Sequence, residues 1–581
     1  MAQPRAQYRS LLATYLKPQG RRVTALAGLL LGSIALQLIN PQILRAFIDA
    51  VTNPHPSGPL TGIALLFIAL AIGQQALSVA ATYVGERVAW TATNNLRTDL
   101  TLHCLRLDLS FHKARTPGEL IERIDGDVTA MANFFSQFVI QILGSLVLLL
   151  GVLVVLWTID WRVGLALTVF ALITLVLMMS MRAIAVPFWK ASRQASADLF
   201  GFIEERLNGV VDIRANGAEA YTMRQLYTYL RERLRTARRA RLVSSLPWGV
   251  PNMAFALGQG LAFALGAMLF SSGDTSLGTA FVIYYYTQLI FQPLNLISNQ
   301  LDDFQKASAG IVRVQELFDT QSSLADGPGV PVPDGPLAVE FDQVEFGYEG
   351  DAAVVHDLSF RVAPGEVLGL LGRTGSGKTT LTRLLLRLYD PTAGAIRLGG
   401  VDLRDAHRAD LRRHIGVVTQ DVQLFAASVR DNLALFDTRI DDARILAALA
   451  ELGLGEWARK LPEGLDTPLA AGGGGLSAGE AQLLAFTRVF LKDPGLVILD
   501  EASSRVDPAT ERLIERAVGK LLQNRTGIII AHRLGTVERA GTILILDEGR
   551  IAEHGPRVAL ATDSGSRFAG LLRTGAAEVL V

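Results

Sequence analysis

The stretch from Gly372 to Thr380, GRTGSGKTT, combines glycines, hydroxyls and a lysine at a spacing that suits phosphate binding. It fits G-x-x-x-x-G-K-[ST] at every defined position. The apolar run Val367–Leu371 before it predicts a buried strand, and Leu381–Leu388 after it predicts a helix. In a glycine-rich turn between a strand and a helix, backbone N–H groups point inward and cradle phosphates. The sequence therefore predicts a nucleoside triphosphate site, because strand, loop and helix together disfavour a chance glycine-rich turn.

Two residues of this loop have distinct expected roles. Lys378 would neutralise the β- and γ-phosphates, and the Thr379 hydroxyl would bind Mg²⁺. The residues expected to contact the nucleotide here are Gly372, Thr374, Gly375, Ser376, Gly377, Lys378, Thr379 and Thr380.

A second motif, Leu496–Glu501 (LVILDE), predicts an apolar strand that ends in two carboxylates. Asp500, at the carboxyl end of the strand, is expected to hold Mg²⁺ through water. Glu501 is placed to orient or deprotonate the water that attacks the γ-phosphate, which makes it a candidate catalytic residue. Such a pair can also be merely solvated, but its occurrence with the phosphate loop favours hydrolysis.

The composition indicates that part of the chain lies in lipid. Of its 581 residues 50% are hydrophobic and 19% charged, and the mean hydropathy is +0.31, values too apolar for an ordinary soluble enzyme. The formal net charge of zero gives no case for a nucleic-acid partner. The single cysteine, Cys104, excludes an intrachain disulfide.

Six apolar segments before about residue 300 are each near the roughly 20 residues that cross a bilayer. They are Val23–Ala46, Leu60–Val84, Phe135–Trp157, Val163–Ile184, Trp248–Phe270 and Gly278–Ile297. The third and fourth are nearly free of polar residues. The others carry Gln, Asn and Gly, which suggests faces turned toward other helices or a wet cavity.

Basic residues predict the orientation of these spans. They precede the first span and fill the two long connections, whereas the loops 51–59 and 271–277 contain no Lys or Arg. The positive-inside rule therefore places both termini and both long connections in the cytoplasm of a multi-pass protein. The sorting of basic residues to alternate helix ends disfavours a soluble bundle, and the abundance of Ala, Arg and Gly suggests a bacterial inner membrane.

The two long connections are predicted to continue the spans as helices, since Leu96–Leu109 and Phe200–Leu234 mix apolar and charged residues at helical spacing. Each contains a break, at residues 115–118 and at residues 215–218, which would form a tip that contacts another domain. A plain surface break is the alternative.

The chain is expected to be multidomain. Residues 1–318 would form an all-α, six-helix transmembrane domain, and residues 319–336, rich in Gly, Pro, Ser and Asp, a linker. Residues 337–581 would form an α/β domain with a mostly parallel sheet, because short apolar runs alternate there with helical segments.

This order of motifs resembles the ATP-binding cassette (ABC) transporters, specifically exporter-type half-transporters. The resemblance covers nearly the whole chain and includes Tyr348 in FGYEG, Gln420 in VVTQD, Leu476–Glu480 (LSAGE), Asp507 in SRVDP and His532 in IIAHRL. It implies that Tyr348 stacks on adenine and that Gln420 contacts Mg²⁺ and senses the γ-phosphate. It implies further that Asp507 crosses to the partner cassette and that His532, the second candidate catalytic residue, contacts the γ-phosphate.

The resemblance also implies pairing. The signature residues Ser477, Gly479 and Glu480 would complete the site of a second half-transporter, so that two cassettes enclose two ATP molecules with Mg²⁺. Residues around Ser110–Thr116 and Ala215–Glu219 would be coupling helices. ATP binding and hydrolysis would then drive alternating access and export of an amphipathic or lipophilic substrate, drug-, lipid- or peptide-like.

The chain departs from the family pattern in its signature. LSAGE replaces LSGGQ, so that Ala478 adds a methyl group and Glu480 a carboxylate, and Thr467–Gly473 lacks the charges of the usual TEVGERG-like segment. With Glu501 and His532 intact, this favours the more competent half of a heterodimer over a homodimer.

The identity of the substrate stays open. Tyr284–Tyr286, Gln288, Phe291, Gln292 and Asn295 in the sixth span suit either cargo contact or helix packing. Alternatives to an exporter are an importer with the same fold, and a channel or regulatory module gated by ATP, against which Glu501 argues.

Overall fold

The structure, a computed structural model, describes residues 13–52, 60–299, 301–348, 352–500, 508–531 and 537–573. The chain divides into two compact units, of which the first comprises Met1–Leu105 and Thr116–Thr320. The second comprises Arg106–Arg115 and Gln321–Val581. The segment 106–115 therefore groups with the second unit although it connects two parts of the first.

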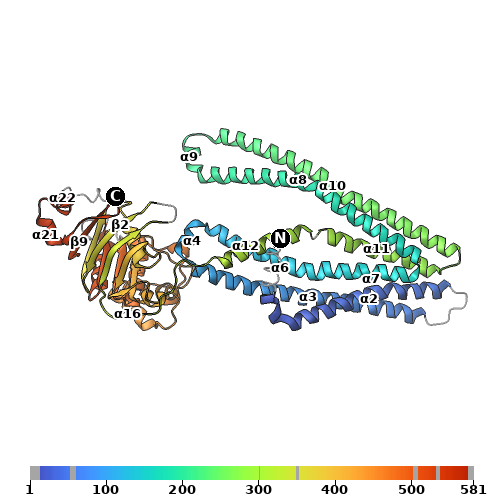
Figure 1. Cartoon of the computed structure of the whole chain (residues 1–581), viewed down its shortest axis with the longest axis horizontal. Helices are drawn as coiled ribbons and strands as arrows, with labels where there is room; N and C mark the ends of the chain where they lie inside the picture. Colours follow the sequence, from blue (N-terminus) through green and yellow to red (C-terminus); the bar gives the residue numbers. More distant parts are fainter. Residues whose placement is uncertain are drawn as a thin grey trace. The chain divides into compact units, whose positions relative to one another are not determined.

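The first unit is helical (Figure 1). Its elements are η1 (Lys17–Gln19), α2 (Gly20–Thr52), α3 (Leu60–Arg106), α5 (Pro117–Ile121), η2 (Glu122–Asp127), α6 (Val128–Gln137), η3 (Phe138–Leu143), α7 (Gly144–Ile159), α8 (Trp161–Asn208), α9 (Val210–Ala215), α10 (Glu219–Ser271), α11 (Leu277–Asn299) and α12 (Leu301–Asp319). The turns η2 and η3 on either side of α6 are π-helical. The long helices extend beyond the predicted spans, which confirms that the connections are helical.

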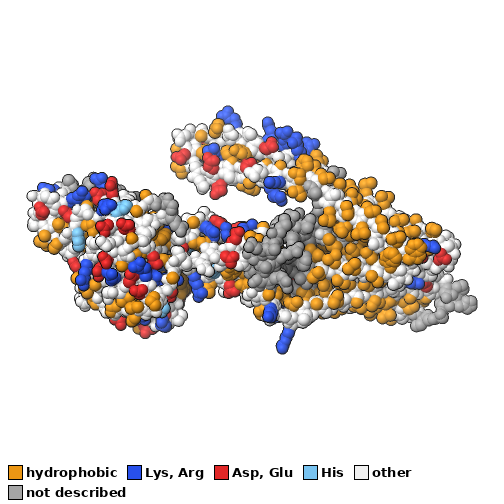
Figure 2. All heavy atoms as spheres, viewed as in Figure 1, with side chains coloured by type: hydrophobic (Ala, Val, Ile, Leu, Met, Phe, Trp, Pro, Cys, Tyr) orange, Lys and Arg blue, Asp and Glu red, His pale blue; other side chains and the backbone are white. Residues whose placement is uncertain are grey.

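Five helical segments of the described residues are long and apolar enough to cross a membrane. They are Ala13–Thr52, Leu60–Arg106, Gln141–Ile159, Trp161–Asn208 and Glu219–Ser271. The helix α11 occupies the predicted sixth span, but its tyrosines and glutamines lower its hydropathy, so it is not among the five. Figure 2 shows hydrophobic side chains over much of the visible face of this unit, with charged side chains gathered along the α8–α10 hairpin beyond the apolar part.

The interface between α2 and α11 shows what Tyr286 does. Its side chain is fully buried; its hydroxyl donates to the carbonyl of Leu38 (2.6 Å) and accepts from Gln42 Nε2 (3.0 Å). Pro41 lies within α2 between these two residues. Tyr286 therefore packs and cross-links two helices, which is the packing alternative left open by the sequence.

A second polar contact joins the ends of the same two helices. Asp49, near the end of α2, accepts from the backbone N–H of Gly278 (2.9 Å) and from the Ser276 hydroxyl (2.8 Å) at the start of α11. A Cβ at position 278 would lie 2.5 Å from Asp49 Oδ1 and 2.6 Å from the Arg45 carbonyl oxygen. Only glycine allows this approach.

The second unit contains α4 and the α/β elements. They are α4 (Leu109–Ala114), β1 (Val339–Phe346), β2 (Val355–Val362), β3 (Val367–Gly372), α13 (Lys378–Leu385), β4 (Ala393–Leu398), β5 (Val401–Asp402), α14 (Arg408–His414), β6 (Ile415–Val418), α15 (Val429–Ala434), α16 (Asp442–Glu451), α17 (Gly455–Arg459), η4 (Gly464–Asp466), η5 (Ala471–Gly473), α18 (Ala478–Lys492), β7 (Leu496–Asp500), α19 (Pro508–Leu522), β8 (Thr526–Ile530), β9 (Thr542–Asp547), β10 (Arg550–Pro556), α21 (Arg557–Thr562) and α22 (Arg567–Arg573).

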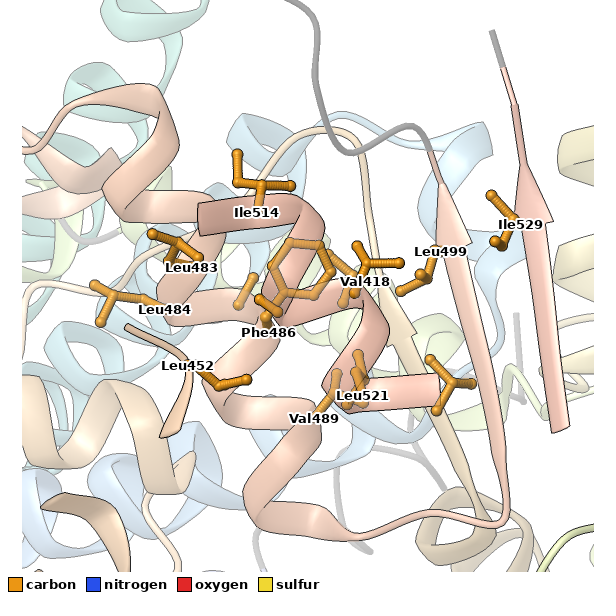
Figure 3. Close-up of a cluster of buried hydrophobic side chains, with 14 of the residues drawn as sticks. Val418, Leu452, Leu483, Leu484, Phe486, Val489, Leu499, Ile514, Leu521 and Ile529 are labelled. Carbon is orange, nitrogen blue, oxygen red and sulfur yellow. The ribbon is translucent and has the colours of Figure 1, made fainter. Parts of the chain in front are cut away.

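The central sheet has the order β10-β9-β3-β8-β7-β6 and is parallel except for β10. Alternate residues of its strands face two hydrophobic clusters, Val497 and Leu499 one of them and Leu496 and Ile498 the other. The apolar runs therefore form a sheet buried on both faces, as predicted. Figure 3 shows the first cluster, in which Leu483, Phe486 and Val489 of α18 lie near Val418 and Leu499 of the strands.

A smaller antiparallel sheet, β2-β1-β4-β5, completes the unit. Its side chains join the second hydrophobic cluster together with Leu381, Leu384 and Leu385 of α13. The helix after the phosphate loop runs from Lys378 to Leu385, so it begins and ends earlier than the predicted Leu381–Leu388, and apolar residues at helical spacing fix it.

Candidate functional site

The carboxyl ends of four parallel strands bring most of the predicted site residues to one edge of the central sheet. Gly372 ends β3, Asp500 ends β7 and the segment with Gln420 follows β6. The strand β8, whose continuation contains His532, lies between β3 and β7. Ligands of such sheets bind at the carboxyl edge, so the topology places the ends of β3, β6 and β7 where one ligand could reach them.

The phosphate loop between β3 and α13 has the backbone that a phosphate cradle needs. Gly372, Gly375 and Gly377 all have positive φ, at 150°, 84° and 103°. At Gly372 a Cβ would lie 2.4 Å from the Leu546 carbonyl oxygen, so the glycine is required by a close approach as well as by its φ. Gly375 is open on its outer side, with no heavy atom within 4 Å of a Cβ placed there.

Two buried polar groups of the loop fit an anionic ligand. The Lys378 ammonium donates to the carbonyls of Gly372 (2.5 Å) and Arg373 (3.0 Å), which holds it inside the loop. The Ser376 hydroxyl is buried without a hydrogen-bond partner. A buried polar atom without a partner costs about 1–3 kcal/mol, and a phosphate oxygen would satisfy it.

The two threonines after Lys378 face different ways. Thr379 is exposed in the first turn of α13, whereas Thr380 is buried. The Thr380 hydroxyl shares a hydrogen bond of 3.1 Å with the hydroxyl of Tyr348. Thr374 is exposed on the loop. The Thr379 hydroxyl is thus the accessible one of the pair.

Tyr348 lies in the segment after β1, half-buried, and is linked to α13 through its hydroxyl. Arg383 Nη1 donates to this hydroxyl (3.0 Å) in addition to the Thr380 contact. Its ring contacts Phe346 and Tyr389 edge-on, with centroids 5.0 and 5.2 Å away. The structure thus connects the candidate adenine-stacking residue to the helix of the phosphate loop. The sequence analysis missed Arg383, although its i+3 spacing from Thr380 indicates a shared helix face.

The donors available for a metal are hard oxygen ligands. Asp500 is half-buried and in register with Ile530 of β8, and Gln420 is exposed after β6. A carboxylate, an amide and the Thr379 hydroxyl match what Mg²⁺ prefers. Among the described residues no cluster of three or more His, Cys, Asp or Glu exists.

The signature residues lie at the start of α18. Ser477 is the N-cap, and it forms a capping box with Glu480. Glu480 Oε2 accepts from the backbone N–H (2.8 Å) and from the hydroxyl (2.9 Å) of Ser477, while the Glu480 N–H donates to Ser477 Oγ (3.2 Å). Gly479 is buried within the first turn. The spacing S-x-x-E is the sequence signal for a capping box, and it was not among the predictions above.

Three of the predicted site residues, Glu501, Asp507 and His532, lie outside the described residues. The predicted first tip is the helix α4, whereas the second tip differs from the prediction. Residues 216–218 form the turn, with Gly217 at φ 62°, and the short helix α9, which ends at Ala215, precedes it. The break marked the turn correctly, but the helix that leads into it lies a few residues earlier.

Comparison with known proteins supports this geometry over nearly the whole chain. A family model described as "ABC transporter transmembrane region" matches residues 24–294, and one described as "ABC transporter" matches residues 355–504. An uncharacterised ABC transporter ATP-binding protein of Bacillus subtilis, YknV, is 29% identical over 97% of this chain and 93% of its own. An ATP-dependent lipid A-core flippase of Pseudomonas fluorescens is 31% identical over 90% of this chain and 89% of its own.

A solved structure agrees in fold. The chain is similar to a bacterial Atm1-family ABC exporter with ATP bound, with a TM-score of 0.78 and 28% sequence identity. The match covers 96% of this chain and 98% of that one.

Proposed function

Since the chain belongs to the ABC transporter family, as an exporter-type half-transporter with an ATPase cassette, we propose that it works as half of a dimer that exports an amphipathic or lipophilic substrate. The observation that carries the proposal is one chain in which membrane-spanning helices are joined to a phosphate loop with three positive-φ glycines. ATP-driven transport follows from that combination.

At the nucleotide, we assign each residue a role from its place in the sequence motifs. The backbone N–H groups of the phosphate loop and Lys378 bind the β- and γ-phosphates, and Tyr348 stacks on adenine. Glu501 orients the attacking water and accepts its proton, while His532 contacts the γ-phosphate. Asp507 contributes across the dimer interface.

Thr379, Gln420 and Asp500 would hold Mg²⁺ in this site. When bound there, the ion would neutralise charge on the phosphates of ATP. The accessible Thr379 hydroxyl and the position of Asp500 at the strand end support this assignment.

Two exposed apolar surfaces support pairing with a second half-transporter. The side chain of Val211 on α9 is 75% exposed, and Leu207 and Val210 beside it are also exposed. On the cassette, Phe425 and Phe436 are exposed with ring centroids 5.9 Å apart. Exposed apolar patches of this kind mark contacts with another protein.

We favour a heterodimer over a homodimer. At the start of α18 the Glu480 carboxylate accepts the Ser477 hydroxyl, which is the group expected to donate to the partner's γ-phosphate. This chain therefore combines an altered signature with the catalytic candidates Glu501 and His532. That combination is expected in one half of a heterodimer whose two ATP sites are unequal.

The orientation follows from charge. Basic residues fill the long connections between spans, so the termini and the cassette are cytoplasmic and the spans cross a bacterial inner membrane.

A lipophilic guest fits an apolar cavity of the first unit. A space of about 560 Å³ is lined by Ile48, Phe263, Ala267, Phe270, Leu277, Ala280, Phe281 and Tyr284, from α2, α10 and α11. Its lining is almost wholly hydrophobic, as expected for an acyl chain or a similar ligand. Filling it through Ala280→Trp should remove stimulation of ATPase activity by lipids or lipophilic drugs. Unaltered stimulation would place the guest elsewhere.

The proposal is tested on the purified chain in nanodiscs. Mg²⁺-dependent ATPase activity and oligomeric mass are measured for the native chain, Lys378→Ala and Glu501→Gln. A dimer whose activity both variants abolish establishes a homodimer that hydrolyses ATP. An inactive or monomeric native chain that gains activity with a second half-transporter supports the heterodimer. Activity that survives both substitutions overturns the assigned site.

A further inference from the structure

The helix α4, which lies between transmembrane helices in sequence, places a cation against the candidate adenine-binding tyrosine. The Lys113 Nζ atom lies 4.4 Å from the centroid of the Tyr348 ring and 6.0 Å from that of Tyr389. The two rings meet edge-on at 86°. An ammonium over aromatic faces at these distances is attracted by their π electrons. Lys113 is therefore held by two rings of the cassette.

The position of Lys113 is fixed by the start of its helix. Asp108 caps α4 by accepting from the backbone N–H of Phe111 (3.2 Å), and it also accepts from the backbone N–H (2.7 Å) and hydroxyl (2.8 Å) of Ser323. Leu109 packs against the same hydrophobic cluster as Tyr348. The helix is thus attached to the cassette on the side where Lys113 meets the rings.

The position of Tyr348 is fixed from the other side by the phosphate loop. Its hydroxyl contacts Thr380 (3.1 Å) and Arg383 (3.0 Å), and Thr380 directly follows Thr379 of the loop motif. A single aromatic ring is therefore held at its hydroxyl by α13 and over its face by α4. Any shift of the ring when a base stacks on it is therefore transmitted to both helices.

We propose that Lys113 is a positioning residue for ATP binding, which holds and polarises the Tyr348 ring for stacking with adenine. The inference rests on the proposed function of Tyr348. An ammonium on one side of a ring draws electron density toward itself and makes the ring a better stacking partner for an electron-rich purine. The base of ATP then contributes to docking of α4, and α4 contributes to binding of the base.

The test is a size-matched removal of the charge, Lys113→Gln, in the full chain with its pairing partner. Cation–π contacts at exposed sites correspond to about a two- to fivefold change in affinity. We expect the KM for ATP to rise by this factor with little change in kcat, and Lys113→Arg to restore it. Lys460→Gln, an exposed lysine elsewhere on the cassette, is the matched control.

A second measurement separates a role at the base from a general loss of structure. Inorganic tripolyphosphate, which has no base, competes for the phosphate loop, and its inhibition constant should be the same in the native chain and in Lys113→Gln. An unchanged KM for ATP, a lowered KM, or equal weakening of ATP and tripolyphosphate would each overturn the proposal. Lys378→Ala in the same assay reports on the ATPase site itself, so that activity surviving in that variant would refute the proposed function instead.

Discussion

Two short helices lie at the far ends of the long membrane helices, and they differ in what their side chains contact. In α4, Asp108, Leu109 and Lys113 are all engaged by the cassette of the same chain. In α9, Val210 and Val211 are exposed, and the helix belongs to the transmembrane unit. The first tip has its contacts within the second unit of the same chain, whereas we propose that the second tip presents its apolar side chains to a partner chain.

This difference indicates which contacts a half-transporter makes within its own chain and which it needs from a partner. A docked tip needs polar anchors that define its place, such as the Asp108 cap. The exposed valines of α9 are costly in water and gain free energy only on association. The dimer is therefore expected to be held partly by α9, and each chain to be driven by its own cassette through α4 and by the partner's through α9.

The largest effect is expected from a charge on α9. Val211→Asp would put an unpaired carboxylate into the partner interface, at a cost of about 3 kcal/mol or more, which corresponds to roughly 100-fold weaker docking. Substrate-stimulated ATPase activity and transport should be lost, while the thermal unfolding temperature of the single chain stays unchanged.

The matched control for this change is Val558→Asp, because Val558 is a similarly exposed valine on α21 of the cassette. Normal coupling in Val211→Asp, or equal losses in both variants, would show that α9 has no partner receptor.

The next largest effect is expected at the anchor of the docked tip. Asp108→Ala removes a helix cap and charge-assisted hydrogen bonds to Ser323, together about 2–4 kcal/mol of docking free energy. Hydrogen exchange in residues 106–115 should become faster. Substrate-stimulated ATPase activity should fall about tenfold, while the affinity for ATP should change less. Asp441→Ala removes the cap of α16 without touching α4 and serves as control; exchange that is equally slow in both variants would refute the anchor.

A smaller effect is expected at α18, a third surface, which we propose to face the second chain. Glu480→Gln removes the carboxylate that accepts the Ser477 hydroxyl and repels phosphate, so ATP turnover by the pair should rise about two- to fivefold, as for a screened surface charge. The gain should shrink at 0.5 M salt. Glu456→Gln on α17 is the control, and a gain that ignores salt would mean that charge is not the cause.

The smallest effect is expected from pH, because the Asp108 anchor should not change between pH 5 and 8. Burial alone would raise the pKa of Asp108, but the hydrogen bonds from Ser110, Ser323 and Phe111 outweigh it and lower the pKa to about 2. Because this pKa lies below the ordinary value of 3.8, the anchor is complete above about pH 4 and is lost only as the pH falls through about 2. Exchange in residues 106–115, corrected for intrinsic rates, should be constant from pH 5 to 8. Loss of protection already near pH 6 would point to another titrating group.

Much of the cassette could be predicted from the sequence because its signals are local. The run Val367–Leu371, the loop after it and the following helix are neighbours in the chain, so pattern and spacing were sufficient for their order, although the helix begins at Lys378 and not at Leu381. The same holds for the strand that ends at Asp500. The capping box of Ser477 and Glu480 could also have been predicted, because its two members are three residues apart.

Contacts between distant segments could not be predicted in this way. Nothing in the sequence near Lys113 indicates that its ammonium meets Tyr348, because the pairing depends on how a loop of the transmembrane region returns to the cassette. Tyr286 was ambiguous for the same reason: a tyrosine in a span suits cargo or packing, and only the position of Leu38 decides. The second tip was misplaced because a glycine marks where a turn lies, while helix length is set by tertiary packing.

The contact of Gly278 with Asp49 has a practical consequence. Because α2 and α11 approach so closely there that a single methyl group would meet Asp49 and the Arg45 carbonyl, position 278 is a natural place for a wedge. A bulky residue such as leucine introduced there would keep the ends of the two helices apart without altering any residue of the cassette. Such a variant would give electron microscopists a transporter whose two helix ends are held apart by a side chain, while the residues of its ATP site are those of the native chain.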